Sequence, residues 1–199
     1  MKAERRLFDT EFEARDGGED GKPAQIRGYG AVYGQMSENL GGFRELIAPG
    51  AFDGVLNDDV RGLINHDSNL ILGRTTSGTL RLSVDERGLA YEIDLPDTSY
   101  AKDLAVSMKR GDISQSSFGF YIDDDEWGED SEGRVIRTVR KVRQLLDVSP
   151  VTYPAYPQTS SEARALVSVD TDGLEAYRAR LKAEREARER HLVMISVGV

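Results

Sequence analysis

The chain has 199 residues, a formal net charge of −9 and no cysteine. The absence of cysteine excludes disulfides, thiolate metal ligands and cysteine nucleophiles, and suits a reducing compartment. The acidic balance argues against a general nucleic-acid binder, because phosphate contacts need a basic surface.

The N-terminal residues do not resemble a secretory signal, and no stretch approaches the roughly 18 apolar residues that would cross a bilayer. We therefore expect a soluble protein of the cytoplasm that binds neither nucleic acid nor membranes. Its first segment, residues 5–15, alternates loosely and predicts an edge strand.

The next segments are also predicted to be strands. Residues 25–34 mix β-branched and aromatic residues with glycines, which in strands often mark the bends or close packing of a barrel. These glycines lack the spacing of a nucleotide-binding loop, and no phosphate-loop lysine follows them. Residues 43–50 predict a strand that ends at a Pro-Gly pair, and a short helix is expected at 51–56.

The middle of the chain combines a strand, a hairpin and a helix. Residues 60–67 predict an apolar strand with His66 at its end or in the following loop. Two alternating runs around the turn sequence DERG give the strongest hairpin signal of the chain. The apolar residues of 97–111 recur with helical spacing, and Gly111 can end that helix.

The last third begins with a serine-rich strand, continues through an acidic turn and returns as a long basic strand that ends in a proline-rich segment. Beyond about residue 160, helix formers predominate and predict a long, exposed helix. We predict a mainly β fold with helices, of the α+β class. Residues 1–160 would form the strand-rich domain and residues 161–199 a helical C-terminal tail.

The acidic segment DDDEWGEDSEG and the basic segment RVIRTVRKVRQ predict a solvated hairpin whose arms attract one another. A local nucleic-acid-binding strip is the alternative. The acidic segment is similar to a calcium loop only in part, because Arg134 occupies the twelfth position, where a bidentate acid is expected. With isolated histidines and no cysteine a zinc site is not expected. We expect no metal ion and no cofactor.

Candidate catalytic groups lie on three different predicted strands. Hydrolysis by a serine nucleophile needs a hydroxyl, a base that takes its proton and a group that orients the base. Of the two histidines, His191 lies in the charged tail, where a surface histidine is the ordinary case. His66 is either a general base or a hydrogen-bonded loop residue. Asp147, in LLDVSPV, is the candidate acid, and only geometry would make these residues a site.

The candidate hydroxyls come from the segment GDISQSSFGF, which contains Ser114, Ser116 and Ser117. Because strand side chains alternate between faces, Ser117 shares its face with Gly119, whereas Ser114 and Ser116 share the opposite face with two phenylalanines. Gly119 leaves room beside Ser117, which a substrate backbone could use. Alternation thus separates Ser117 from the other two serines.

The chain resembles the prohead maturation proteases of tailed phages in the order of its motifs GYGAVYG, ELIAPGAF, LINHDSNLILGRTTSGTLRL, GLAYEIDLPDT, RGDISQSSFGF and LLDVSPVTYPAYP. The resemblance covers residues 5–160. It implies a serine endopeptidase with a β-barrel fold related to the herpesvirus assembly proteases. Such enzymes are packaged inside the immature head, where they remove scaffolding segments from the capsid protein and then digest themselves.

By position, the resemblance implies that His66 of the NHD motif is the general base, that Ser117 is the nucleophile and that Asp147 orients His66. Asp147 stands where glutamate is expected in many relatives, and a Gln-Ser pair replaces small or apolar residues between the serines. Ser114 and Ser116 therefore stay as alternative nucleophiles or as hydroxyls that support the site.

The resemblance also implies partners and a place of action. The expected partners are the major capsid protein and scaffold segments, together with further copies of the chain. The expected place is the interior of the prohead in the cytoplasm of the bacterial host. The alternative function is that of a non-catalytic capsid assembly or scaffold protein that acts through its helical tail.

Overall fold

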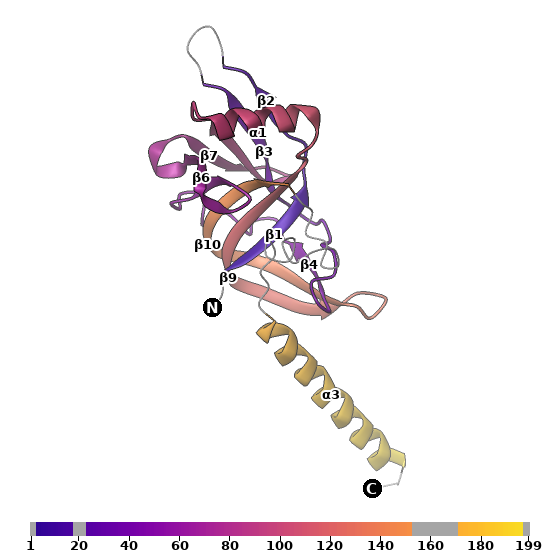
Figure 1. Cartoon of the computed structure of the whole chain (residues 1–199). Helices are drawn as coiled ribbons and strands as arrows, with labels where there is room; N and C mark the ends of the chain where they lie inside the picture. The colour runs from indigo at the N-terminus through magenta and orange to yellow at the C-terminus, as the bar shows by residue number, and fades with distance from the viewer. Residues whose placement is uncertain (1–2, 18–22, 153–170, 197–199) are drawn as a thin grey trace. The chain divides into compact units, whose positions relative to one another are not determined.

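The computed structural model describes residues 3–17, 23–152 and 171–196 (Figure 1). The chain divides into two compact units, residues 1–169 and residues 170–199. The expected proline-rich end of the last strand and the expected domain boundary at residue 160 lie outside the described residues. Strands dominate the first unit and a helix the second, which confirms the mainly β, α+β class.

The first unit contains two sheets. The larger has the order β1-β9-β10-β5-β6, and β4 also pairs with β10; its strands are β1 (Glu4–Asp9), β4 (Arg44–Ile47), β5 (Arg61–Ile64), β6 (Asp67–Arg74), β9 (Gln115–Glu129) and β10 (Val135–Val151). The smaller has the order β2-β3-β8-β7; its strands are β2 (Glu13–Arg15), β3 (Gln25–Val32), β7 (Leu80–Val84) and β8 (Gly88–Asp94).

Neither sheet closes on itself within the described residues, so the expected barrel takes the form of two open sheets. The N-terminal segment that was predicted as one strand forms β1 in the larger sheet and β2 in the smaller sheet. Between them, Thr10 donates its N–H to the Ser114 carbonyl and accepts the Tyr29 N–H on its side-chain oxygen. Thr10 thus bonds through its backbone to the residue before β9 and through its side chain to β3.

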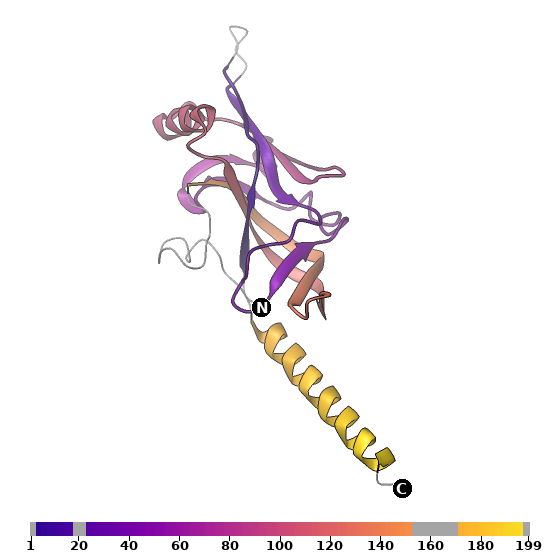
Figure 2. The same cartoon turned by 90° about the vertical axis from the view of Figure 1, so that its right-hand side faces the viewer.

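The predicted helix at residues 51–56 is wrong, because hydrogen-bonded turns fill this segment. Gly50 has φ +83° and lies just before the segment, and Gly54 lies within it, so glycine weakens helix formation at both places. The other helix prediction is confirmed. Helix α1 (Ser99–Arg110) begins after Thr98, ends at Gly111 with φ +81°, and lies at one end of the sheets (Figures 1 and 2).

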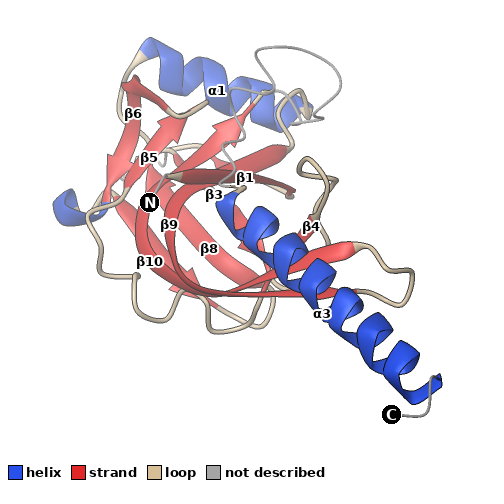
Figure 3. Ribbon diagram, turned by 90° about the horizontal axis from the view of Figure 1, so that it is seen from below, coloured by secondary structure: helices blue, strands red, loops and turns tan. Residues whose placement is uncertain are grey.

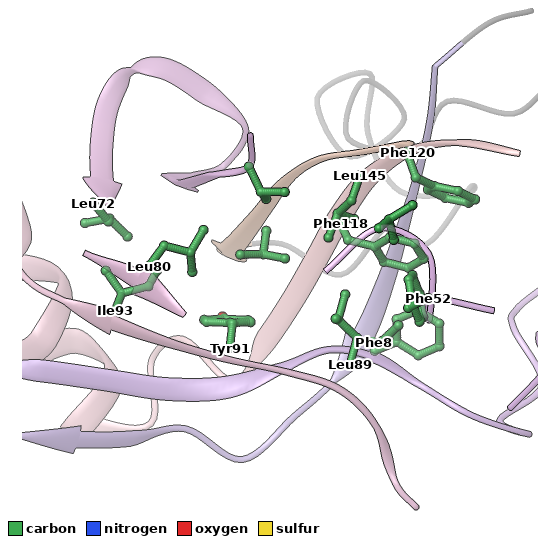
Figure 4. Close-up of a cluster of buried hydrophobic side chains, with 14 of the residues drawn as sticks. Phe8, Phe52, Leu72, Leu80, Leu89, Tyr91, Ile93, Phe118, Phe120 and Leu145 are labelled. Atoms are coloured by element: carbon green, nitrogen blue, oxygen red, sulfur yellow. The ribbon is translucent and has the colours of Figure 1, made fainter. Parts of the chain in front are cut away.

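Both sheets contribute to one hydrophobic core (Figure 4). Phe118 is central to its aromatic part: its ring stacks on Phe120 with centroids 4.4 Å apart and meets the edge of Phe52 at 5.4 Å. Each fully buried side chain of this size stabilises the fold by roughly 1.5–3 kcal/mol relative to exposure. The serine-rich strand is therefore held in place by its own phenylalanines.

Strands β9 and β10 form a long, curved hairpin that crosses the first unit (Figure 3). Most of the acidic segment belongs to β9, and the turn itself is confined to residues 130–134, where the Asp130 carboxylate accepts the backbone N–H of Arg134. Exposed ion pairs join the two arms, including Arg140 with Asp124 at 3.0 Å and Lys141 with Asp123 at 2.8 Å. The predicted hairpin of oppositely charged arms is confirmed.

A buried ion cluster, formed by Glu4, Arg6, Glu45, Arg137 and the half-buried Asp125, ties β1, β4, β9 and β10 together. Arg6 bonds Glu45 at 2.6 Å and also bonds Glu4. Arg137 reaches Glu4 at 3.0 Å and bonds Asp125 as well. Each charge in the cluster therefore has an opposite charge within hydrogen-bonding distance, as buried charges require.

The second unit consists of helix α3 (Asp172–Ser196), and most of its described side chains are exposed. Charged residues occur around the helix, with ion pairs such as Arg180 with Glu184 four residues apart. The long C-terminal helix predicted from composition is thus present. Among the described residues, no helix is both long and apolar enough to cross a membrane.

Candidate active site

The register of the β9–β10 hairpin gathers four small or polar residues on one face. Ser117 of β9 lies opposite Ser149 of β10, and Gly119 lies opposite Asp147. Since residues two apart share a strand face, all four project to the same side. Ser117 and Asp147 are diagonal neighbours, for which a separation of about 7–8 Å is usual, so a third group is needed to connect them.

His66 is that group. Its Nε2 atom lies 2.6 Å from the Ser117 hydroxyl oxygen, and its Nδ1 atom bonds the Oδ1 atom of Asp147. An ionised carboxylate can only accept, so Nδ1 carries the proton, and Nε2 is left to accept the Ser117 hydroxyl proton. The imidazole thereby connects the two strands across the diagonal.

A strained turn presents His66 to the hairpin. Strands β5 and β6 pair up to Ile64 and Asp67, which leaves Asn65 and His66 as a two-residue loop. Both have positive φ, +52° and +59°, and they are the only non-glycine residues with this property in the described ranges. Such hairpin loops favour Asn-Gly, so His66 occupies the position where glycine is preferred.

The side chain of Asn65 anchors this turn to the end of β10. Its Oδ1 atom accepts the Thr152 N–H at 2.9 Å, and its Nδ2 group donates to the Thr152 hydroxyl at 3.0 Å. The Asn65 N–H also donates to the Pro150 carbonyl at 3.0 Å. Asparagine tolerates positive φ better than most residues, and these bonds hold the turn beside the strand that carries Asp147.

The three side chains are buried. Ser117 is 0% exposed, and His66 and Asp147 are each 8% exposed. A β carbon added to Gly119 would lie 2.4 Å from the Oδ2 atom of Asp147. The Asp147 carboxylate therefore fills the room beside Gly119 that was expected to be open to a substrate backbone, and that expectation was wrong.

The structure places the other two serines away from His66. The Ser116 hydroxyl lies on the opposite strand face, 3.1 Å from the Tyr91 hydroxyl. Burial raises the pKa of Tyr91, which keeps its phenol protonated. Ser114 is exposed, and its carbonyl accepts the Thr10 N–H. His66, Ser117 and Asp147 are thus brought together, and Ser114 and Ser116 are not.

Three residues that contact the site were not predicted from the sequence. Asn65 and Thr152 hold the turn, and Ser149 donates its hydroxyl proton to Asp147 Oδ1 at 2.8 Å. A signal for Ser149 was present, because it follows Asp147 by two residues and therefore shares its strand face. In the described ranges no group of three or more His, Asp or Glu side chains could hold a metal ion.

A hydroxyl, an imidazole and a carboxylate in hydrogen-bonded series form the arrangement that serine hydrolases use, on several unrelated folds. Residues 9–190 match the family model described as caudovirus prohead serine protease, and the chain belongs to this family. The matched region reaches beyond residue 160 and includes most of α3, whereas the resemblance recognised in the sequence covered residues 5–160.

Two known proteins illustrate the similarity. The prohead protease of Enterobacteria phage HK97 is 30% identical over 164 residues, which cover 80% of this chain and 66% of that protein. The chain thus matches just under two thirds of the length of that relative. The capsid assembly protease of bacteriophage T4 aligns in structure with a TM-score of 0.46 and 13% identity, covering 77% of this chain and 100% of the other.

Proposed function

We propose that the chain is a serine endopeptidase of phage head maturation, with Ser117 as nucleophile, His66 as general base and Asp147 as the residue that orients His66. The observation that carries the proposal is the hydrogen-bonded series from Ser117 Oγ through the imidazole to Asp147 Oδ1. Membership of the prohead serine protease family supports it.

The reaction follows from this geometry. Ser117 Oγ attacks the scissile carbonyl carbon while its proton passes to His66 Nε2, and Asp147 stabilises the imidazolium that forms. The proton then passes from Nε2 to the leaving amine nitrogen as the C–N bond breaks, which leaves an ester on Ser117. A water molecule, deprotonated by His66, hydrolyses the ester, releases the new carboxyl end and restores the Ser117 hydroxyl.

The proposed substrates are scaffold and capsid-protein segments and the chain itself, cleaved inside the prohead in the host cytoplasm. The name of the HK97 relative, a prohead protease, supports this place of action. We assign proteolysis to residues 1–160. The tail, residues 161–199, would tether the enzyme to scaffold or shell, or be clipped on activation, and self-association of the chain stays a prediction.

Co-expression with the neighbouring capsid gene product tests this function. We expect the wild type to shorten the capsid protein and itself, and Ser117→Ala and His66→Ala to abolish both cleavages. Ser114→Ala is the matched control, because it removes an exposed hydroxyl from the same segment and should leave cleavage intact. Unchanged processing in both site variants would refute the assigned roles, whereas assembly without any cleavage by the wild type would favour the scaffold-protein alternative.

A further inference from the structure

The Asp147 carboxylate accepts hydrogen bonds from two side chains, and only one of them has a role in the proposed reaction. His66 Nδ1 and the Ser149 hydroxyl both bond its Oδ1 atom. The Ser149 oxygen also lies 3.5 Å from His66 Nδ1. Two hydrogen-bond donors therefore meet at one carboxylate oxygen.

The surroundings of Ser149 are those of a core position. The residue is 0% exposed, and its neighbours Val148 and Val151 on the same strand are buried apolar residues. A hydroxyl in such a place is unfavourable unless it is hydrogen-bonded, and the bond to an ionised carboxylate is among the strongest available to it. This bond gives the buried hydroxyl of Ser149 its partner.

Two contacts together define how the carboxylate is turned. The backbone at Gly119 leaves space for Oδ2, and Ser149 holds Oδ1 on the side that faces His66. The terminal torsion of an aspartate is broad, so a carboxylate held by His66 alone could rotate about it. With Oδ1 fixed, the Nδ1 proton has a stationary acceptor and the imidazole keeps one orientation.

We propose that Ser149 is a positioning residue, which holds the Asp147 carboxylate in the orientation that directs His66 Nε2 at Ser117. This inference rests on the proposed function, since it assigns a role in the same site. Ser149 acts through Asp147 and His66 and is separate from the nucleophile, although it lies directly opposite Ser117 across the β9–β10 ladder.

The test compares Ser149→Ala with Ser116→Ala, which is a closely matched control. Both serines are 0% exposed and lie on paired strands, but the Ser116 hydroxyl contacts the Tyr91 hydroxyl and, at 3.4 Å, the backbone carbonyl of Ser149, and it does not contact Asp147. A third variant, Ser149→Thr, keeps the hydroxyl. Each full-length variant is first checked by circular dichroism and urea unfolding, so that a loss of fold is recognised as such.

The first readout is the rate at which a fluorophosphonate probe modifies the protein. Ser117 Oγ bonds to phosphorus, fluoride leaves, and the hydroxyl proton passes to His66, so the rate reports how well the nucleophile is activated. We expect Ser149→Ala to react roughly tenfold more slowly than wild type, because this factor corresponds to the free energy that a hydrogen bond to a charged group usually contributes. Ser116→Ala should react at the wild-type rate, and Ser149→Thr should recover most of the loss.

The second readout is the NMR resonance of the His66 Nδ1 proton, which needs no catalytic activity. The chain has only two histidines, so substitution of His191 assigns the signal. We expect a downfield resonance in wild type and Ser116→Ala, and its broadening by exchange in Ser149→Ala. A sharp resonance in Ser149→Ala together with a wild-type labelling rate would overturn the inference.

The two readouts distinguish a failure of this inference from a failure of the proposed function. If the probe fails to modify wild type, or modifies Ser117→Ala equally well, the proposed function fails, and the resonance still reports on the Ser149 contact. If wild type is labelled at Ser117 and Ser149→Ala behaves as wild type does, only the positioning role fails.

Discussion

The two halves of the β9–β10 hairpin use polar residues in opposite ways. In the half that contains Ser117 and Asp147, these two side chains are buried and each bonds to His66, while Ser149 bonds to Asp147. In the half nearer the turn, pairs such as Arg140 with Asp124 lie on the surface, with about half of each side chain exposed. Hydrogen bonds are stronger where water is excluded, so a few buried bonds hold the site rigid. Exposed ion pairs contribute little to stability, because water and salt screen them.

The half nearer the turn contains one buried and one exposed arginine. Substituting each of them gives the largest effect that we expect from the difference between buried and exposed charges. The Arg137 side chain is 7% exposed and belongs to the buried ion cluster, while Arg140, three residues on, is 53% exposed. We expect Arg137→Ala to lower the free energy of unfolding by about 3–5 kcal/mol, because it leaves the three carboxylates of the cluster, two of them buried, with Arg6 as the one remaining positive charge of that cluster. Arg140→Ala should cost less than about 1 kcal/mol. Urea unfolding measures both, and equal costs would contradict the contrast.

Two glycines of β9 give the next prediction. A methyl group at Gly119 would displace the Asp147 carboxylate, whereas Gly128 has no neighbouring atom within 4 Å of the added carbon. We expect Gly119→Ala to slow fluorophosphonate labelling by roughly a hundredfold or more, as small displacements of catalytic groups do. Gly128→Ala should leave the rate unchanged. Equal rates for the two variants would show that the Asp147 position does not matter.

The His66 turn gives a smaller effect. Asn65→Gly and Asn65→Ala both remove the side-chain bonds to Thr152, but only alanine is penalised by the positive φ of this position. We expect the alanine variant to be less stable than the glycine variant by about 1 kcal/mol. Thermal or urea unfolding of the pair measures the strain, and equal stabilities would mean that the turn relaxes at no cost.

The smallest effect concerns pH and the exposed arm. Lys141 lowers the pKa of the Asp123 carboxyl, through a hydrogen bond and its positive charge. A carboxyl with a lowered pKa in the folded state stabilises the protein above its unfolded pKa, and that contribution is lost as pH falls through the folded value. In Lys141→Gln we expect the pKa of Asp123, followed by carboxyl NMR, to rise toward its ordinary value. The free energy of unfolding at pH 7 should hardly change. A large decrease would show that this exposed ion pair stabilises the fold as much as a buried one.

Local patterns in the sequence predicted much of the fold. Helical spacing and Gly111 marked α1, alternation marked the β7–β8 hairpin, and complementary charge marked the β9–β10 hairpin. Alternation also separated Ser117 from Ser116, because the face of a strand residue depends only on its position along the strand. The motif NHD and the residues around Asp147 indicated the rest of the site through resemblance to a family.

What the sequence could not predict depends on contacts between distant segments. Nothing local places Ser149 opposite Ser117 or brings Glu45 to Arg137, because strand register and sheet order are tertiary properties. The hairpin loop at His66 escaped recognition since its Asn-His pair lacks the glycine that signals such turns. The room beside Gly119 was visible in the sequence, but its occupant, Asp147, was not.

The identity of the nucleophile is the central claim, and one measurement tests it most directly. The full-length protein is treated with a fluorophosphonate, digested, and analysed by mass spectrometry to locate the modified residue in the segment GDISQSSFGF. The account predicts modification of Ser117 alone, lost in His66→Ala and kept in Ser116→Ala. Modification of Ser114 or Ser116, or undiminished labelling of Ser117→Ala, would contradict it.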